Sequence, residues 1–223
     1  TIDKVLNNPE SKFYKQLAAA YDKAGFHYMG MLQNGTFRLT TANTNLKDLA
    51  AYKGLKIRTM SNKNHMAFWT AIGAEPTPLA FPELYFALQS GTVNAEENAA
   101  DTIVTMNFNE VQKFLAPTNH ILYTNQMAMN KKAYESLDPA YQKALNQAVS
   151  EALKELAPKL GEIDKQNKET LEKKGMTIIK YDKSFYDQVL ALDSVKALYK
   201  DINSQINGIG DVLMQELDAA AKK

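Results

Sequence analysis

The sequence contains no cysteine among its 223 residues. This absence excludes disulfides, thiolate catalysis and cysteine-based zinc sites. Histidine is also scarce, since it occurs only at positions 27, 65 and 120, and these positions do not have the spacing of metal ligands. The sequence therefore predicts neither a metal site nor a bound cofactor.

Long apolar runs and an excess of one charge are missing as well. A membrane-spanning helix needs roughly 18 or more consecutive apolar residues, and no such run occurs. The 26 Lys and Arg residues are nearly balanced by 25 Asp and Glu residues, which gives a net charge of +1. The sequence thus predicts no insertion into a membrane and no nucleic-acid partner.

The motifs of common enzyme classes do not appear. There is no P-loop, no dinucleotide-binding glycine motif after a strand, no nucleophile elbow and no zincin motif. Glu83, Glu96 and Glu97 could form an acid/base or metal-binding set. The pattern around them favours a different interpretation, in which they are carboxylates at helix ends and on the surface.

The composition is that of an ordinary globular protein, with 45% hydrophobic and 23% charged residues. Strand and helix patterns alternate along the chain, which predicts an α/β fold. The expected helices cover 11–24, 62–72, 82–89, one or two segments within 99–114, 183–200 and 209–221. The expected strands cover 26–32, 37–40 after a turn at 35–36, 55–58, 92–94, the extended segment 119–129, and 176–181.

One expected helix is much longer than the others. Asp138 and Pro139 form a strong start, with Asp as the cap and Pro in the first turn. Small and apolar residues then recur at helical spacing toward Lys174, and Gly175 ends the pattern. Pro158 lies inside this helix and should kink it.

The segment Gly54-Leu55-Lys56-Ile57-Arg58 is the first candidate for a site. Leu55 and Ile57 alternate with Lys56 and Arg58, so a short strand should carry a guanidinium at its carboxyl end. Open α/β sheets bind ligands at that end, and a guanidinium offers two parallel donors to a carboxylate. The alternative is a surface arginine that ends a strand.

A resemblance extends this interpretation. The Gly54 to Arg58 segment, the segment from Gly73 to Val93 and the pair Glu97-Asn98 stand in the order and spacing of one family. The chain resembles the substrate-binding proteins of TRAP transporters, periplasmic receptors that capture organic acids for a sodium-driven permease. The resemblance is specific over 35–123 and weaker outside.

The resemblance implies a two-lobed, periplasmic-binding-protein-like α/β fold with a long helix spanning both lobes. Lobe one is expected at 1–35 and 124–163, and lobe two at 36–123 and 164–223. Relative to the family the chain starts late, inside lobe one. We therefore expect a fragment whose first lobe is incomplete at its start.

The resemblance also assigns roles to single residues. Arg58 would fix the ligand's carboxylate, and Arg38, in a segment similar to the family's Gly-x-x-Arg, would reach the same group. Asn98 ends a segment, Asn94 to Asn98, that keeps only the last two residues of the family's Asp-Gly-Gln-Glu-Asn motif. An asparagine amide can donate to a carboxylate without adding charge. The alternatives are an exposed hairpin residue for Arg38 and a helix cap for Asn98.

Three further contacts are implied by the same resemblance. Phe81 lies where the family places an aromatic side chain against the ligand, and Ser61 and His120 where it sometimes contributes polar contacts. Each has an ordinary structural alternative. Phe81 could belong to the core, Ser61 could cap the following helix, and His120 could be a strand histidine satisfied within the protein.

The function that the resemblance implies is capture, without chemistry, of an organic acid between two lobes in the periplasm, and its delivery to the permease subunits of a TRAP transporter. The alternative is a small-metabolite enzyme or a ligand-gated sensor domain on the same scaffold, since a fold does not dictate a function. An enzyme would turn its ligand over, whereas a receptor would return it unchanged after long incubation.

Overall fold

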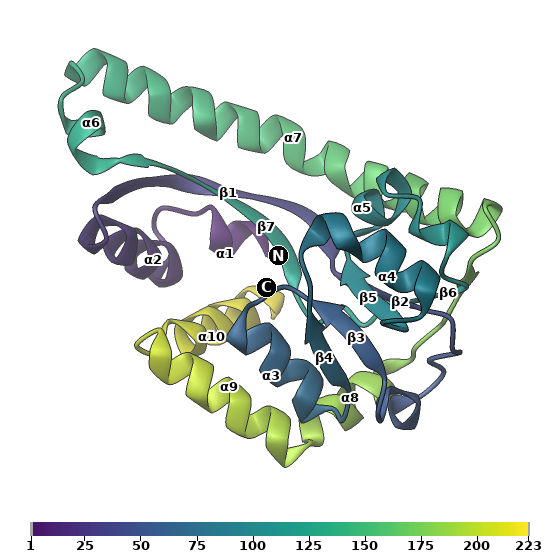
Figure 1. Ribbon diagram of the computed structural model, residues 1–223. Helices are drawn as coiled ribbons and strands as arrows, with labels where there is room; N and C mark the ends of the chain where they lie inside the picture. Colours follow the sequence, from purple (N-terminus) through teal and green to yellow (C-terminus); the bar gives the residue numbers. More distant parts are fainter. Residues whose placement is uncertain (1, 223) are drawn as a thin grey trace. The chain divides into compact units, whose positions relative to one another are not determined.

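A computed structural model describes residues 2–222 (Figure 1). The chain divides into two compact units. Unit 1 combines the chain up to residue 35 with 123–161 and the segment from 203 onward, and unit 2 combines 36–122 with 162–202. The segment from 203 onward, which was expected in lobe two, belongs to unit 1.

Unit 1 contains a two-stranded sheet and several helices. The strands are β1 (Phe26–Phe37) and β7 (Leu122–Asn130). The helices are α1 (Asp3–Leu6), α2 (Lys12–Lys23), α6 (Lys131–Glu135) and α10 (Ile209–Ala221), together with the first part of α7 (Pro139–Lys173). The expected turn at 35–36 is wrong, since β1 continues without a break through both residues.

The C-terminal helix α10 packs against α1 and α2, which explains the assignment of this segment to unit 1. The contact includes a helix cap supplied from far along the chain. The Glu216 carboxylate accepts hydrogen bonds from the backbone amides of Lys12 and Phe13, both at 2.9 Å. Ser11, the predicted cap, also accepts from the amide of Tyr14. The start of α2 is thus held by two side chains.

The long helix predicted from Asp138 is confirmed as α7, a single helix of 35 residues. It continues through Pro158, although a proline inside a helix removes one backbone hydrogen bond. Residues 139–161 belong to unit 1 and the remainder to unit 2. None of the helices described is long and apolar enough to cross a bilayer.

Unit 2 is built on a six-stranded sheet in the order β4-β3-β5-β2-β6-β8. The strands are β2 (Leu39–Ala42), β3 (Lys56–Thr59), β4 (Glu75–Pro78), β5 (Ala95–Asn98), β6 (Phe114–Ala116) and β8 (Thr177–Ile178). The sheet is mixed, because β3 runs parallel to β4 and β5 whereas β2 runs antiparallel to β5 and β6. β5 is therefore an interior strand with neighbours on both sides (Figure 1).

Two expectations for this unit are corrected. The strand predicted at 92–94 begins only at Ala95, because Val93 is buried in the core and the chain bends before it joins the sheet. The amphipathic segment 183–200 is two helices, α8 (Lys183–Ala191) and α9 (Asp193–Gln205). Leu192 separates them, since its backbone is extended with ψ at 129°.

Each face of the unit 2 sheet has its own apolar cluster. The first cluster contains Ile57 and Ala95 and is covered by α3 (Lys63–Ala71), α8 and α9, with Trp69 fully buried in it. The second cluster contains Leu39 and is covered by α4 (Leu84–Ser90), α5 (Ala100–Thr105) and the end of α7. Short 3₁₀ turns complete the unit at Leu49–Tyr52, Phe81–Glu83 and Phe108–Glu110. The sheet is thus buried on both faces.

The cap between Glu216 and α2 generates a prediction about stability. We expect Glu216→Ala to lower the free energy of unfolding by about 1 kcal/mol, because two amides at the start of the helix lose their acceptor. Thermal unfolding should show this as a decrease of roughly 2 to 4 °C in Tm. Asp218→Ala on the same helix is the control and should leave Tm unchanged. Equal effects of the two variants would contradict the cap.

Candidate ligand-binding site

The site is organised around two carboxylates that are buried in the middle of the unit 2 sheet. Glu96 and Glu97 are consecutive residues of β5, and each is 0% exposed. Successive side chains of a strand point to opposite faces. Ala95 packs in the first cluster, so Glu97 points to that face and Glu96 to the other. The expectation that these are surface or helix-end carboxylates is wrong.

Glu97 is paired with Arg38, which lies between β1 and β2. Arg38 Nε donates to Glu97 Oε2, and Nη2 donates to Glu97 Oε1 at 3.1 Å and to the backbone carbonyl of Glu97 at 2.7 Å. Arg38 itself is buried. A fork that binds both carboxylate oxygens is the strongest geometry available to this pair. Arg38 is therefore not the exposed hairpin residue of the alternative interpretation.

Two histidines complete the surroundings of Glu97. His120 Nε2 lies 3.1 Å from Glu97 Oε2, and its Nδ1 lies 3.0 Å from the Thr118 hydroxyl. The nitrogen Nδ1 of His65, on α3, lies 3.8 Å from Glu97 Oε1. Burial acts to raise the pKa of Glu97, but the contacts with both histidines and the charge of Arg38 lower that pKa below its usual range. Glu97 is thus an anion.

Glu96 has a different environment on the opposite face. Its Oε1 lies 2.9 Å from the Thr41 hydroxyl, and its Oε2 accepts a hydrogen bond of 2.6 Å from Asn98 Nδ2. Burial raises the pKa of Glu96 to about 7, although the hydrogen bonds from Asn98 and Thr41 act in the opposite direction. The two neighbouring carboxylates therefore differ greatly in the pH range where they ionise.

Arg58 occupies the carboxyl half of β3, as the sequence predicted. The structure adds that it lies directly beside Glu96 in the strand register. Its Nε and Nη2 donate to the backbone carbonyl of Leu79, at 3.0 and 2.8 Å. Its Cζ lies 5.6 Å from the centre of the Phe81 ring. Arg58 is only 3% exposed, and no carboxylate of the described residues lies within 4.0 Å of its nitrogens.

Burial acts to lower the pKa of the Arg58 guanidinium, and the nearby carboxylates Glu96 and Glu97 act to raise it. A guanidinium remains protonated despite such effects on its pKa. Arg58 is therefore a fixed cation whose side chain is oriented by a carbonyl and an aromatic ring. Its Nη1 makes no hydrogen bond to the residues that the structure describes.

Asn98 connects the two halves of the site. Its Oδ1 accepts from Arg38 Nη2 at 2.9 Å, while its Nδ2 donates to Glu96. The amide cannot be turned over without bringing Nδ2 against the guanidinium and Oδ1 against the carboxyl group. Asn98 is not a helix cap, because Ala99 occupies the cap position of α5 and no side chain caps it.

The three remaining predicted residues have separate environments. Phe81 is 37% exposed and meets Phe108 edge to face, so it is not a core residue. Ser61 is exposed and does not cap α3, since Asn62 accepts from the amides of Asn64 and His65. His120 stacks on Phe68, and both its ring nitrogens have partners within the protein.

Sequence reasoning did not include most of the residues around the two carboxylates. Thr41, His65, Gln112 and Thr118 were not singled out, and Glu97 was placed on the surface. The only signal in the sequence was the scarcity of arginine, since the chain contains two, Arg38 and Arg58, and both lie near these carboxylates.

The third member of the suggested acid/base set, Glu83, is exposed and ends the 3₁₀ turn before α4. Within residues 2–222, no group of three or more His, Asp or Glu side chains is arranged to hold a metal ion. The set of Glu83, Glu96 and Glu97 therefore does not act as one buried group.

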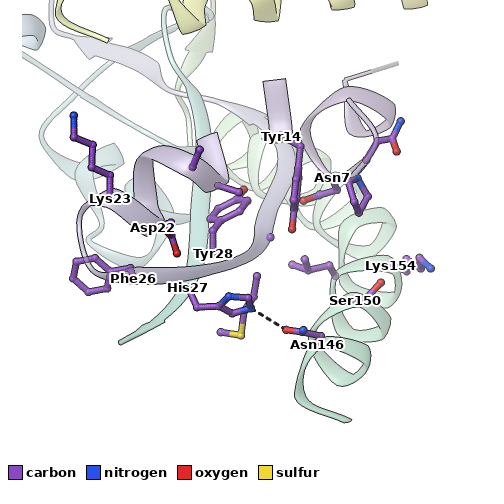
Figure 2. A pocket seen from close by; sticks show the side chains of 17 residues that line it. Asn7, Tyr14, Asp22, Lys23, Phe26, His27, Tyr28, Asn146, Ser150 and Lys154 are labelled. Carbon is purple, nitrogen blue, oxygen red and sulfur yellow. Dashed lines mark hydrogen bonds between the residues drawn. The ribbon is translucent and has the colours of Figure 1, made fainter. Parts of the chain in front are cut away.

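A large cavity lies elsewhere, in unit 1. It has a volume of about 1250 Å³ and is lined by residues 7–9, α2, the first half of β1 and the first half of α7 (Figure 2). His27 points across it to Asn146, at 3.3 Å. None of the six predicted site residues lines this cavity. We place the site at the carboxylates because charged groups converge there.

A sheet covered by helices, with an unpaired arginine near the carboxyl end of a strand, is typical of α/β proteins that bind small ligands. The comparisons with known proteins are more specific. The chain belongs to the family of bacterial extracellular solute-binding proteins, family 7, whose model matches residues 3–205. This confirms the resemblance found in the sequence.

Similar proteins include a solute-binding protein of Verminephrobacter eiseniae, 34% identical over 83% of this chain and 55% of that protein. The sialic acid-binding periplasmic protein SiaP of Vibrio cholerae is 32% identical over 78% of this chain and 52% of its own length. The chain thus spans about half the length of these curated relatives.

A solved structure of a TRAP periplasmic solute-binding protein from Desulfovibrio salexigens, with bound orotic acid, has the same fold. It superimposes with a TM-score of 0.79 at 29% identity, and the match covers 95% of this chain and 67% of that one. The predicted fold class, an α/β fold of the TRAP solute-binding type, is therefore confirmed.

The pairing of Arg38 with Glu97 can be tested by unfolding. We expect Arg38→Ala to lower the free energy of unfolding by about 3 to 5 kcal/mol, because it leaves a buried carboxylate without its cation. The double variant Arg38→Ala/Glu97→Ala should lose less than the sum of the two single changes, as measured by urea denaturation.

The control for this experiment is Lys56→Ala on β3, whose side chain is exposed. It should change the free energy of unfolding by less than about 0.5 kcal/mol. Additive losses in the double variant would show that Arg38 and Glu97 do not depend on each other.

Proposed function

We propose that the protein is a periplasmic receptor that captures an organic acid through its carboxylate and delivers it to the permease of a TRAP transporter. Arg58 is the main anchor of the carboxylate, and the amide of Asn98 is a second donor. The single observation that carries this proposal is the buried guanidinium of Arg58, which has hydrogen bonds to a carbonyl and no carboxylate partner among the described residues.

The contrast between the two arginines supports this assignment. Arg38 uses Nε and Nη2 on Glu97 and Asn98, so its charge is already compensated within the protein. Arg58 binds only the Leu79 carbonyl, which carries a partial charge and cannot neutralise a cation. A buried cation without a counter-ion is costly, and a ligand carboxylate would provide the missing charge. Arg38 then acts mainly as a support for Glu97 and Asn98.

The other predicted contacts fit this assignment to different degrees. Phe81 is partly exposed beside Arg58, so we retain it as a surface for the body of the ligand. His120 acts through Glu97, since both its nitrogens are occupied. Ser61 is retained only as an exposed polar residue at the start of the α3 segment.

The ligand class is supported by two of the three similar proteins, since one is named for a carboxylic acid and the other contains one. SiaP of Vibrio cholerae is named for sialic acid, and the Desulfovibrio salexigens structure contains orotic acid. These acids share a carboxylate and little else. The common group is thus the one that a fixed guanidinium recognises. Receptors of this kind bind without chemistry, so the ligand should be recovered unchanged.

The first prediction is selective stabilisation by acids. Sialic acid, orotate and further organic acids should raise Tm by several degrees when present at about 100 times their Kd, where binding contributes about 2.7 kcal/mol. The matching amides, which carry no negative charge, should leave Tm unchanged. Differential scanning fluorimetry measures both. Equal shifts from acid and amide would rule out recognition of the carboxylate.

The second prediction concerns Arg58 itself. Arg58→Ala should weaken binding of the most stabilising acid by about 3 to 5 kcal/mol, on the order of hundreds-fold or more, with little change in fold. Arg58→Lys should also bind poorly, since an ammonium lacks the planar fork. Isothermal titration calorimetry is the measurement, and Lys56→Ala is the matched control. Near-normal affinity of Arg58→Ala would remove Arg58 from the site.

A further inference from the structure

The hydroxyl of Thr41 lies between two acceptors. It is 2.9 Å from Glu96 Oε1 and 3.3 Å from Oε1 of Gln112. All three side chains are buried. A hydroxyl has one hydrogen and can donate to only one of these oxygens at a time.

The amide of Gln112 cannot resolve this conflict by turning over. Its Nε2 donates to the backbone carbonyl of Val111 at 2.8 Å, which fixes Oε1 toward Thr41. Asn98 likewise offers Glu96 only one donor, at Oε2. If Glu96 is ionised, either Glu96 Oε1 or Gln112 Oε1 faces Thr41 without a hydrogen. One extra proton removes the conflict.

We propose that Glu96 is a neutral carboxylic acid in mildly acidic solution, which donates through Oε1 to Thr41, and that its proton sets the charge that the site presents to a ligand carboxylate. Thr41 then donates to Gln112, so that each close contact among Glu96, Thr41 and Gln112 is a hydrogen bond. Glu96 still accepts from Asn98 through its other oxygen. Glu96 is thus a positioning residue for the amide of Asn98 and for the field at Arg58.

The charged groups around Glu96 support a neutral state. Burial is the main cause that raises its pKa to about 7, and the adjacent anion Glu97 acts in the same direction. Arg38 acts in the opposite direction, and Arg58 is the neighbouring cation on β3. His65 and His120 contact Glu97 rather than Glu96. Glu96 therefore holds its proton below about pH 7 and loses it above.

The consequence for binding rests on the proposed function. With Glu96 neutral, Arg38 and Glu97 cancel and Arg58 leaves one positive charge, which matches one carboxylate. With Glu96 ionised, the site has no net charge and a second anion beside the ligand. Affinity for a carboxylate should therefore be highest below pH 7 and should fall by up to tenfold per pH unit above it.

The proton can be located without any ligand. Protein labelled with carbon-13 at the glutamate carboxyl groups should show one carboxyl resonance with a midpoint near pH 7, and Glu96→Gln should remove that resonance. Glutamine keeps both contacts, because its amide donates to Thr41 and accepts from Asn98. Glu83→Gln, at an exposed glutamate, should leave the resonance in place. A Glu96 midpoint near the ordinary 4.5 would overturn the proposal.

The link to ligand charge has its own test on the same resonance. Arg58→Met should raise the Glu96 midpoint by on the order of one pH unit, because the neighbouring cation is lost. Acetate, the smallest carboxylate, should raise it in wild-type protein and not in Arg58→Met, and acetamide should have no effect. If the midpoint lies near 7 but changes neither in Arg58→Met nor on addition of acetate, the role of the proton in binding would be overturned.

The two failures can be told apart. If Arg58→Met moves the midpoint but acetate does not, Arg58 does not bind the anion, and the proposed function is overturned. That result would also overturn the ligand-linked part of this inference. If acetate binds but Glu96 titrates near 4.5, the proposed function stands and the neutral acid does not exist.

Discussion

The burial of two adjacent carboxylates in one interior strand is the constraint on which the rest of unit 2 depends. A charge in the middle of a sheet is tolerated only with compensation, and the chain compensates its two glutamates differently. On one face Glu97 receives a guanidinium fork and two imidazoles. On the other face Glu96 has only a hydroxyl and an amide. This asymmetry leaves one arginine without an internal counter-ion.

The segments that the sequence predicted correctly are those whose signals are local. Ser11 caps α2, the Asp138-Pro139 start opens α7, and alternation around Arg58 gives β3. The strand after Gly91 was misplaced because Ala95 to Asn98 has no apolar alternation: two of its four side chains are buried carboxylates. Their burial depends on partners from three other segments, and no local pattern reveals such pairing.

The same reasoning explains which site residues could be found. Arg58 could be predicted from the alternation in its own strand and from the family motif. The role of Arg38 as the partner of Glu97 was not, because the two residues lie 59 positions apart and meet only through the antiparallel pairing of β2 with β5. The placement of α10 in unit 1 was missed for a similar reason, since its capping contact spans most of the chain.

That capping contact has a consequence for the order in which the protein folds. The amide of Lys12 and the carboxylate of Glu216 are 204 positions apart, so the start of α2 receives this cap only after the segment that contains Glu216 has been synthesised. The strands β2 to β6 of unit 2, by contrast, come from one continuous stretch of sequence. Contacts between distant positions form slowly because a long loop must close first. The strands β2 to β6 can therefore pair before α2 and α10 meet, whereas the apolar clusters on the two faces of their sheet are completed only when α7, α8 and α9 are in place.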